Sequence, residues 1–173
     1  MRLFVAVNFA ERTRARLLAL RDELESRSAR GNFSLPENLH LTLAFLGGCD
    51  AEQDAMTRAI LGGMIFRPFD VTIDRIGRFR RDGGDLWWAG VAESKALAEV
   101  QRTITNQLAS AGMLADRRKF SPHVTLGREV VTNAMPWPIG AFSETVSRLD
   151  LMKSERIGGR LTYTVIYSKE GSG

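Results

Sequence analysis

Short apolar stretches alternate along this chain with segments whose apolar residues repeat at helical spacing. The runs 3–7 and 86–89 are almost entirely apolar, which is typical of buried strands. After each run, residues recur at intervals of three and four, first a threonine and three leucines over 13–24 and then four apolar residues over 97–108, and this spacing forms one face of a helix. The pattern therefore predicts a strand followed by a helix, twice.

The ends of the predicted helices follow from capping and turn residues. Asn8 or Glu11 can cap the first helix, Ser94 can cap the second, and Gly112 is placed where the second should end. We also expect a helix over 51–65 with Asp50 as its cap, followed by a strand over 69–76. The second half should lack a counterpart of this helix, because Pro136 and Pro138 interrupt the corresponding stretch. The final strands are expected over 144–153 and 161–167, joined by a turn at Gly158–Gly159.

The chain contains only two histidines, and each opens the same four-residue pattern. At 40–43 and at 123–126, a histidine is followed by an apolar residue, a threonine and a leucine. Because successive side chains of a strand point to opposite faces, the histidine and threonine of each copy share one face and the apolar residues pack against the core. The side chains predicted on these polar faces are His40, Thr42, His123 and Thr125.

The repeated pattern extends beyond the two motifs. When the sequence is shifted so that His40 falls on His123, the apolar run 3–6 falls on 86–89, and each run leads through a predicted helix and a polar, turn-rich stretch to a histidine strand. A duplicated unit of this kind predicts two lobes related by an approximate two-fold axis, with the two motifs facing each other across a cleft. We expect one bilobal α+β domain over 1–173, with a mainly antiparallel sheet and outer helices in each lobe.

Composition narrows the possible functions only slightly. The 173 residues carry a net charge of +4 and one cysteine, Cys49. A mildly basic chain suits an anionic ligand, and a single cysteine excludes an intramolecular disulfide and fits a reducing compartment. No apolar run is long enough to cross a membrane, and the first predicted strand is too short for a signal peptide. We expect a monomeric cytoplasmic protein with no membrane partner.

The candidate chemistry is proton transfer by two imidazoles. Two histidines and one cysteine cannot form a zinc site of three or four ligands without carboxylates, and no glycine-rich phosphate loop is present, so we expect neither a metal nor a cofactor. One imidazole can accept a proton while the other donates one. Opening of a cyclic phosphodiester by water needs only these two groups, with Thr42 and Thr125 donating hydrogen bonds to the non-bridging oxygens.

The two motifs resemble the paired H-x-T/S-x motifs of the two-histidine (2H) phosphoesterases. Their flanks, 36–47 and 120–128, are similar to those of one branch, the RNA 2′,3′-cyclic phosphodiesterases, also called 2′-5′ RNA ligases, and the opening 2–7 resembles the first strand of that branch. The resemblance implies a bilobal α+β fold and cleavage of the 2′,3′-cyclic phosphate ends of RNA to 2′-phosphate ends. It also implies a reverse activity that joins RNA ends through a 2′-5′ linkage without ATP.

The resemblance also implies roles for individual residues. By family analogy, His40 donates a proton to the leaving 3′ oxygen and His123 accepts the proton of water, although the sequence itself leaves the two roles open. Arg128 matches an arginine that the family uses against phosphate. Because Arg128 and His123 are an odd number of positions apart, a regular strand would turn them to opposite faces, so we expect either a bulge at Gly127 or the end of the strand.

Two other functions fit the same residues. The histidine pair could hydrolyse a small cyclic nucleotide or a nucleotide-sugar cyclic phosphate, and the weakly basic composition does not separate this function from action on an RNA end. The cleft could also belong to a non-catalytic module that binds RNA ends, although such a module would not need two titratable histidines. The basic clusters within 78–81 and 117–119 could guide RNA or could be solvated surface.

Overall fold

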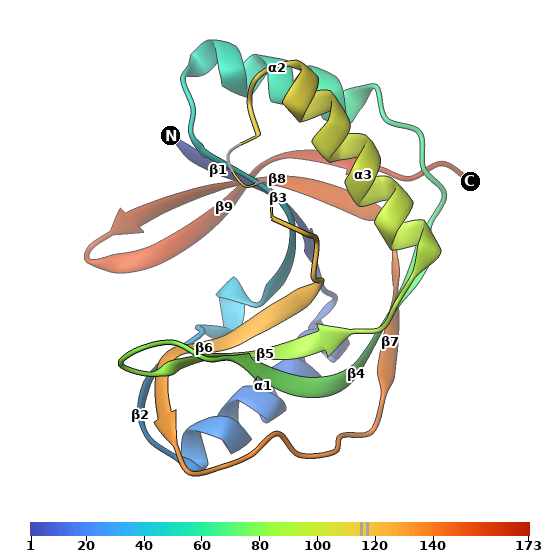
Figure 1. The fold of residues 1–173 in the computed structure, drawn as a ribbon. Helices are drawn as coiled ribbons and strands as arrows, with labels where there is room; N and C mark the ends of the chain where they lie inside the picture. The colour runs from blue at the N-terminus through green and yellow to red at the C-terminus, as the bar shows by residue number, and fades with distance from the viewer. Residues whose placement is uncertain (115, 117) are drawn as a thin grey trace.

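The computed structural model describes residues 1–114, 116 and 118–173 (Figure 1). In this part of the chain, nine strands combine with three α-helices and one short 3₁₀ helix. The strands are β1 (Arg2–Asn8), β2 (Ser28–Phe33), β3 (His40–Gly48), β4 (Phe69–Phe79), β5 (Asp85–Val91), β6 (His123–Thr132), β7 (Phe142–Val146), β8 (Arg148–Ile157) and β9 (Arg160–Glu170). The helices are α1 (Glu11–Ser26), α2 (Ala51–Gly62), α3 (Lys95–Ser110) and the 3₁₀ helix η1 (Pro36–Asn38).

The strands join into one curled antiparallel sheet (Figure 1). Its order is β7-β4-β5-β6-β3-β1-β8-β9, and β2 pairs with β6 off this path. The two strands that begin at histidines, β3 and β6, are neighbours, and they are joined at the pair Leu41–Val124. The predicted α+β class is confirmed: two antiparallel halves, with helices outside them, meet at the histidine strands.

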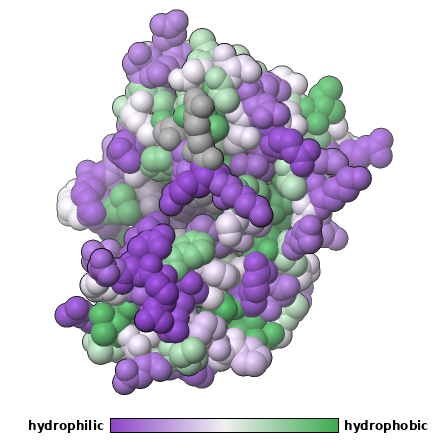
Figure 2. All heavy atoms as spheres, viewed as in Figure 1, coloured by the Kyte–Doolittle hydropathy of each residue, from purple (hydrophilic) through white to green (hydrophobic). Residues whose placement is uncertain are grey.

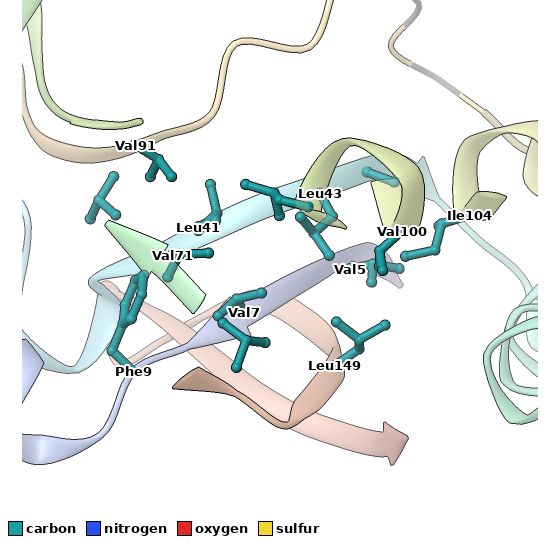
Figure 3. Packing of buried hydrophobic residues seen from close by; sticks show 14 of the residues in the cluster. Val5, Val7, Phe9, Leu41, Leu43, Val71, Val91, Val100, Ile104 and Leu149 are labelled. Atoms are coloured by element: carbon teal, nitrogen blue, oxygen red, sulfur yellow. The ribbon is translucent and has the colours of Figure 1, made fainter. Parts of the chain in front are cut away.

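Each half of the sheet is covered by a helix from the other part of the chain. Helix α1 follows β1 but packs against β2, β6 and β7, whereas α3 follows β5 and packs against β3 and α2. Figure 1 shows α1 below the sheet, and α2 and α3 together above it. In Figure 3, Val100 and Ile104 of α3 lie close to Val5 and Leu43, and all four are buried. One hydrophobic cluster therefore runs through both halves.

The predicted helix caps are confirmed for two helices and wrong for the third. Asp50 caps α2 in a capping box, and the side chain of Ser94 accepts a backbone hydrogen bond at the start of α3. Helix α1 instead begins after Ala10, whose backbone N–H donates to the carboxylate of Glu144 at 3.0 Å. Because Glu144 comes from β7, far along the chain, no local sequence pattern could indicate this cap.

Two strand predictions need correction. The single strand expected over 144–153 is two strands, because the chain pairs with β4 through β7 and then crosses at Ser147 to the other half, where β8 pairs with β1 and β9. The polar, turn-rich stretch that leads to His40 also contains a strand that the sequence does not indicate, β2, which pairs with β6. Its residues are mostly exposed, so it lacks the alternation that indicates a strand. The turn at Gly158–Gly159 is confirmed, with positive φ at both glycines.

Candidate active site

The two histidine strands turn their polar faces to the same side of the sheet. Leu41 of β3 and Val124 of β6 are completely buried on the helix side. The alternating side chains are half-buried on the opposite face, and these are His40, Thr42, His123 and Thr125. The predicted orientation of both motifs is therefore confirmed.

These faces line one cleft with a volume of about 830 Å³. All five residues predicted for the site lie on its wall, namely His40, Thr42, His123, Thr125 and Arg128. Figure 2 shows hydrophilic side chains gathered around a hollow on this side of the molecule. The volume is in the range of small-molecule and cofactor sites. The fold thus brings together two segments that are far apart in the sequence.

Both imidazoles are held by the same type of contact. The Nδ1 atom of His40 lies 2.7 Å from the carbonyl oxygen of Asn38, and Nδ1 of His123 lies 2.6 Å from the carbonyl oxygen of Ser121. Because a carbonyl oxygen can only accept a hydrogen bond, each Nδ1 carries a proton and donates it. The lone pair of each neutral ring is then on Nε2, so Nε2 is the atom that can exchange a proton with a ligand.

The two sites differ in the hydrogen bond at Nε2. The hydroxyl of Thr42 donates to Nε2 of His40 at 2.9 Å, as the tautomer requires. In the described part of the chain, no equivalent hydrogen bond joins the Thr125 hydroxyl to Nε2 of His123. The backbone carbonyl of Thr125 accepts a separate hydrogen bond from the hydroxyl of Ser34 at 2.8 Å. The two motifs are therefore alike in position and different in hydrogen bonding.

Aromatic rings enclose both imidazoles. The ring centroid of His40 lies 4.9 Å from that of Phe4 and 5.2 Å from that of Tyr163, which meets it edge to face. The ring centroid of His123 lies 5.4 Å from that of Phe79, also edge to face. These contacts fix the orientation of the two rings and exclude water from around them.

This enclosure lowers the pKa of both histidines in the free protein. Burial, which disfavours the charged imidazolium, lowers the pKa of His40 from 6.5 to about 4; the hydrogen bond to Asn38 opposes this effect, and the charge of Arg128 adds to it. Burial also lowers the pKa of His123, with Arg128 and Arg118 contributing. Both rings are therefore neutral at pH 7 in the free protein, and an anion in the cleft favours their protonation.

A bulge in β6 turns Arg128 into the cleft. Strand β6 has one residue more than β5 between Thr125 and Gly127. The extra residue shifts the alternation by one position, so Arg128 comes to the same wall as His123. The next residue, Glu129, has a φ of 52°, a left-handed conformation that glutamate seldom adopts. The bulge expected at Gly127 is confirmed.

Strand β3 has a similar irregularity at the matching position. Its register with β1 shifts between Thr42 and Ala44. Phe45 follows Thr42 at the same spacing at which Arg128 follows Thr125, and Phe45 also lines the cleft. Matching positions therefore supply a cation from β6 and an aromatic ring from β3. The cleft is chemically asymmetric although its two strands are similar.

The family of the chain follows from comparison with known proteins. A family model described as the 2′-5′ RNA ligase superfamily matches residues 8–156. The protein belongs to the 2′-5′ RNA ligase superfamily. It is 33% identical over 168 residues to the RNA 2′,3′-cyclic phosphodiesterase of Escherichia coli (strain K12), and this alignment covers 94% of this chain and 92% of the relative. It is also 33% identical over 129 residues to the protein of the same name from Archaeoglobus fulgidus, and this alignment covers 74% of this chain and 72% of the relative.

Solved structures with 26–27% sequence identity to this protein have the same fold. The crystal structure of E. coli LigT complexed with 3′-AMP superposes with a TM-score of 0.86 at 27% identity, covering 99% of this chain and 98% of that one. The crystal structure of TT0787 of Thermus thermophilus superposes with a TM-score of 0.84 at 26% identity, covering 98% and 97%. The family that the motifs resemble and the fold that the resemblance implies are both confirmed.

The basic clusters of this superfamily member contribute unevenly to the cleft. Arg78 turns away, because its guanidinium lies 5.5 Å from the ring centroid of the buried Trp87. Arg80 pairs with Asp85 at 3.3 Å. Arg117 lies outside the described residues. The cluster members that line the cleft are Arg81, Arg118 and Lys119.

Sequence reasoning missed the part of the wall that comes from β9 and η1. Tyr163 touches an imidazole, and Asn38 holds the same imidazole through its carbonyl while its side-chain amide donates to the carbonyl of Leu161 at 3.1 Å. Arg156 and Arg160, from the hairpin that joins β8 to β9, also line the cleft. The glycine pair between them indicated a turn, but no local signal indicated which part of the molecule the turn would contact.

Groups that commonly bind metal ions are scattered in the described structure. Among residues 1–114, 116 and 118–173, no three His, Cys, Asp or Glu side chains lie together in a group that could hold a metal. Cys49 is buried and unbonded to another cysteine. The helices of this part of the chain are all too short or too polar to cross a membrane.

Proposed function

We propose that this protein hydrolyses the 2′,3′-cyclic phosphate ends of RNA to 2′-phosphomonoesters without a metal ion, by acid–base catalysis between His40 and His123. The observation that carries the proposal is the presence of both imidazoles on the wall of one cleft, each with Nδ1 bonded to a carbonyl so that Nε2 is the atom left for proton exchange. Relatives named RNA 2′,3′-cyclic phosphodiesterase that align with most of the chain support the same activity.

The proposed reaction needs two proton transfers. Nε2 of neutral His123 takes a proton from water, and the water oxygen attacks phosphorus in line with the 3′ oxygen. The bond between phosphorus and the 3′ oxygen breaks while protonated His40 donates its Nε2 proton to that oxygen. The products are a 3′ hydroxyl and a 2′-phosphomonoester, and exchange with solvent returns both rings to their starting states. Each transfer of this kind contributes about 10²–10⁴-fold to a rate.

Thr42, Thr125 and Arg128 are the proposed ligands of the non-bridging oxygens. In the free protein the Thr42 hydroxyl donates to Nε2 of His40. When Nε2 is protonated it can no longer accept, so the Thr42 hydroxyl is released to donate to the phosphate and the Nε2 proton is left for the 3′ oxygen. Protonation of His40 and binding of phosphate are thereby coupled through one hydroxyl. Arg128 supplies a charge-assisted hydrogen bond to the same group.

The same site supports the reverse activity implied by the family. If the 5′ hydroxyl of a second RNA replaces water, the same transfers give a 2′-5′ linkage, and no ATP is needed because the cyclic phosphate is already activated. A non-catalytic module that binds RNA ends would not need two titratable imidazoles on the wall of one cleft. The monomeric state, the cytoplasmic location and the single duplicated domain over 1–173 stay predictions from the sequence.

Product analysis tests this function directly. An RNA oligonucleotide with a 2′,3′-cyclic end is incubated with the protein and EDTA, and the new end is identified by chromatography against 2′- and 3′-phosphate standards. We expect only the 2′-phosphomonoester. A variant lacking both imidazoles, purified in the same way, controls for contaminating ribonuclease. Formation of only the 3′-phosphomonoester would refute the leaving group, and loss of activity in EDTA would refute the metal-free mechanism.

A further inference from the structure

The hairpin between β8 and β9 places two arginines on the wall that holds His40. Arg156, near the end of β8, and Arg160, at the start of β9, are exposed and line the cleft. The Asn38 side chain donates to the carbonyl of Leu161 at 3.1 Å, and the Asn38 carbonyl accepts from Nδ1 of His40. The hairpin and the imidazole are therefore connected through a single residue.

The proposed chemistry determines which wall the nucleoside occupies. In an in-line displacement, the entering water and the leaving 3′ oxygen lie on opposite sides of phosphorus. His123 serves the water, and His40 serves the 3′ oxygen, which belongs to the ribose. The ribose, and the RNA chain joined to its 5′ oxygen, therefore extend along the wall of His40 and the hairpin.

We propose that Arg156 and Arg160 bind the phosphodiester on the 5′ side of the terminal nucleotide, so that the hairpin makes the enzyme prefer RNA ends to cyclic mononucleotides. This inference rests on the proposed function and names the substrate class that the same site selects. A 2′,3′-cyclic mononucleotide has a hydroxyl at its 5′ position, whereas an RNA end has a phosphate there. The planar guanidinium of arginine suits this task because it binds two phosphate oxygens at once.

Both arginines are held loosely in the free protein. Nη1 of Arg156 donates to the carbonyl of Gly159 at 3.1 Å. Arg160 forms an ion pair with Glu37 of η1, but the two side chains are 60% and 51% exposed, and exposed ion pairs of this kind stabilise a protein little. A phosphate placed between the two arginines can therefore displace the carboxylate of Glu37.

The cations on the His123 side of the cleft provide a comparison for the two hairpin arginines. Arg81 also lines the cleft and belongs to the turn between β4 and β5, which lies below the β8–β9 hairpin in Figure 1. Arg118, also on the cleft wall, is held by the carboxylate of Asp116 at 2.7 Å. These cations would meet the nucleoside only if the roles of the two histidines were exchanged. Replacing Arg81 therefore reports on the alternative placement of the RNA.

The test compares a 2′,3′-cyclic mononucleotide with an oligonucleotide that ends in the same nucleotide. The wild-type protein is expected to have the higher kcat/KM on the oligonucleotide. In the double variant Arg156→Ala/Arg160→Ala, this value should fall by about 10- to 100-fold, as expected for loss of one or two charge-assisted contacts, while kcat/KM on the mononucleotide stays within about three-fold. The double variant should also show a shallower salt dependence on the oligonucleotide, by about 0.7 in the log–log slope per lost phosphate contact.

Two single variants sharpen the comparison. Arg12→Ala, on an exposed position of α1, a helix of which no residue lines the cleft, is the matched control and should leave kcat/KM on both substrates unchanged. Glu37→Gln removes the carboxylate that competes for Arg160, so kcat/KM on the oligonucleotide should rise by up to about five-fold.

Three results would overturn the hairpin proposal and leave the proposed function intact. These are an equal loss on both substrates in the double variant, no loss on the oligonucleotide, or a selective loss on the oligonucleotide in Arg81→Ala alone. The last result would place the RNA on the opposite wall. If the wild-type protein hydrolyses neither substrate, the proposed function fails and this inference fails with it.

Discussion

Adenosine 2′-monophosphate carries the type of end that the proposed reaction produces, and its binding should reverse the lowered pKa of His40. In the free protein, burial and the charge of Arg128 lower this pKa from 6.5 to about 4. A ring with such a pKa carries no proton at pH 7, yet the proposed general acid must carry one. The negative charge of the bound phosphate must therefore supply the difference.

The charge of one phosphate is large enough for this reversal. The drop in pKa from 6.5 to about 4 corresponds to about 3 kcal/mol in favour of the neutral ring. A negative charge about 4 Å from the imidazolium contributes about 4 kcal/mol at an effective dielectric constant of about 20. A phosphate held by Thr42 and Arg128, within reach of Nε2 of His40, is therefore sufficient to return the pKa of His40 close to its ordinary value.

The assay is an NMR titration of the imidazole Cε1–H signals. Because the chain has only two histidines, the spectrum contains two such signals, and the one missing in His40→Asn belongs to His40. We expect His40 to titrate near pH 4 in the free protein, and close to its ordinary pKa of 6.5 in the nucleotide complex. Since protonation of the ring and binding of the anion favour each other, the nucleotide should bind more tightly as the pH falls between these two values.

Two results would refute the reasoning. If His40 titrates at its ordinary value of 6.5 in the free protein, the burial argument is wrong. If its pKa stays low in the nucleotide complex, the ring cannot donate a proton at neutral pH and the acid role of His40 fails. Sodium chloride at matched ionic strength controls for a general salt effect on the signals.

Three further substitutions test other parts of the structure. Arg128→Gln removes a cation that lowers the pKa of both imidazoles, so both should rise in the free protein by NMR, while KM for a cyclic end increases about 10- to 100-fold. Asp150→Ala removes a buried carboxylate that accepts hydrogen bonds from Asn8 and Arg148, so urea unfolding should show a free energy of unfolding lowered by about 3 kcal/mol. An unchanged free energy of unfolding would mean that these contacts of Asp150 do not stabilise the fold. Asp50→Ala deletes the cap of α2 and should lower the free energy of unfolding by about 1 kcal/mol, without an effect on kcat.

The centre of the site could be predicted because the two histidine strands are regular up to the motif threonines. Alternation alone placed Leu41 and Val124 in the core and the histidines on the opposite face, as the structure has them. Arg128 needed more than alternation, because an extra residue in β6 reverses the face on which it lies. The glycine beside it indicated where such a bulge could occur.

Other features of the fold and of the cleft rim could not be predicted because they depend on contacts between distant segments. Glu144 caps α1 from β7, and Glu37 pairs with Arg160 across the cleft rim. The crossing of the chain at Ser147 splits a stretch that has the composition of one strand. No local periodicity encodes such pairings, so the sequence indicated the histidines and the β8–β9 turn but not that this hairpin lines the cleft beside them.

The central claim is that His40 and His123 act on one phosphorus atom as acid and base. Single-turnover hydrolysis of a 2′,3′-cyclic oligonucleotide, in EDTA, measures it most directly for the wild type, for His40→Ala, for His123→Ala and for the double variant. We predict that each single variant, with a wild-type circular dichroism spectrum, loses at least about 10²-fold, and that the double variant is hardly slower, because the two groups act as a unit. A wild-type rate in either single variant, or losses that simply multiply in the double variant, would contradict the account.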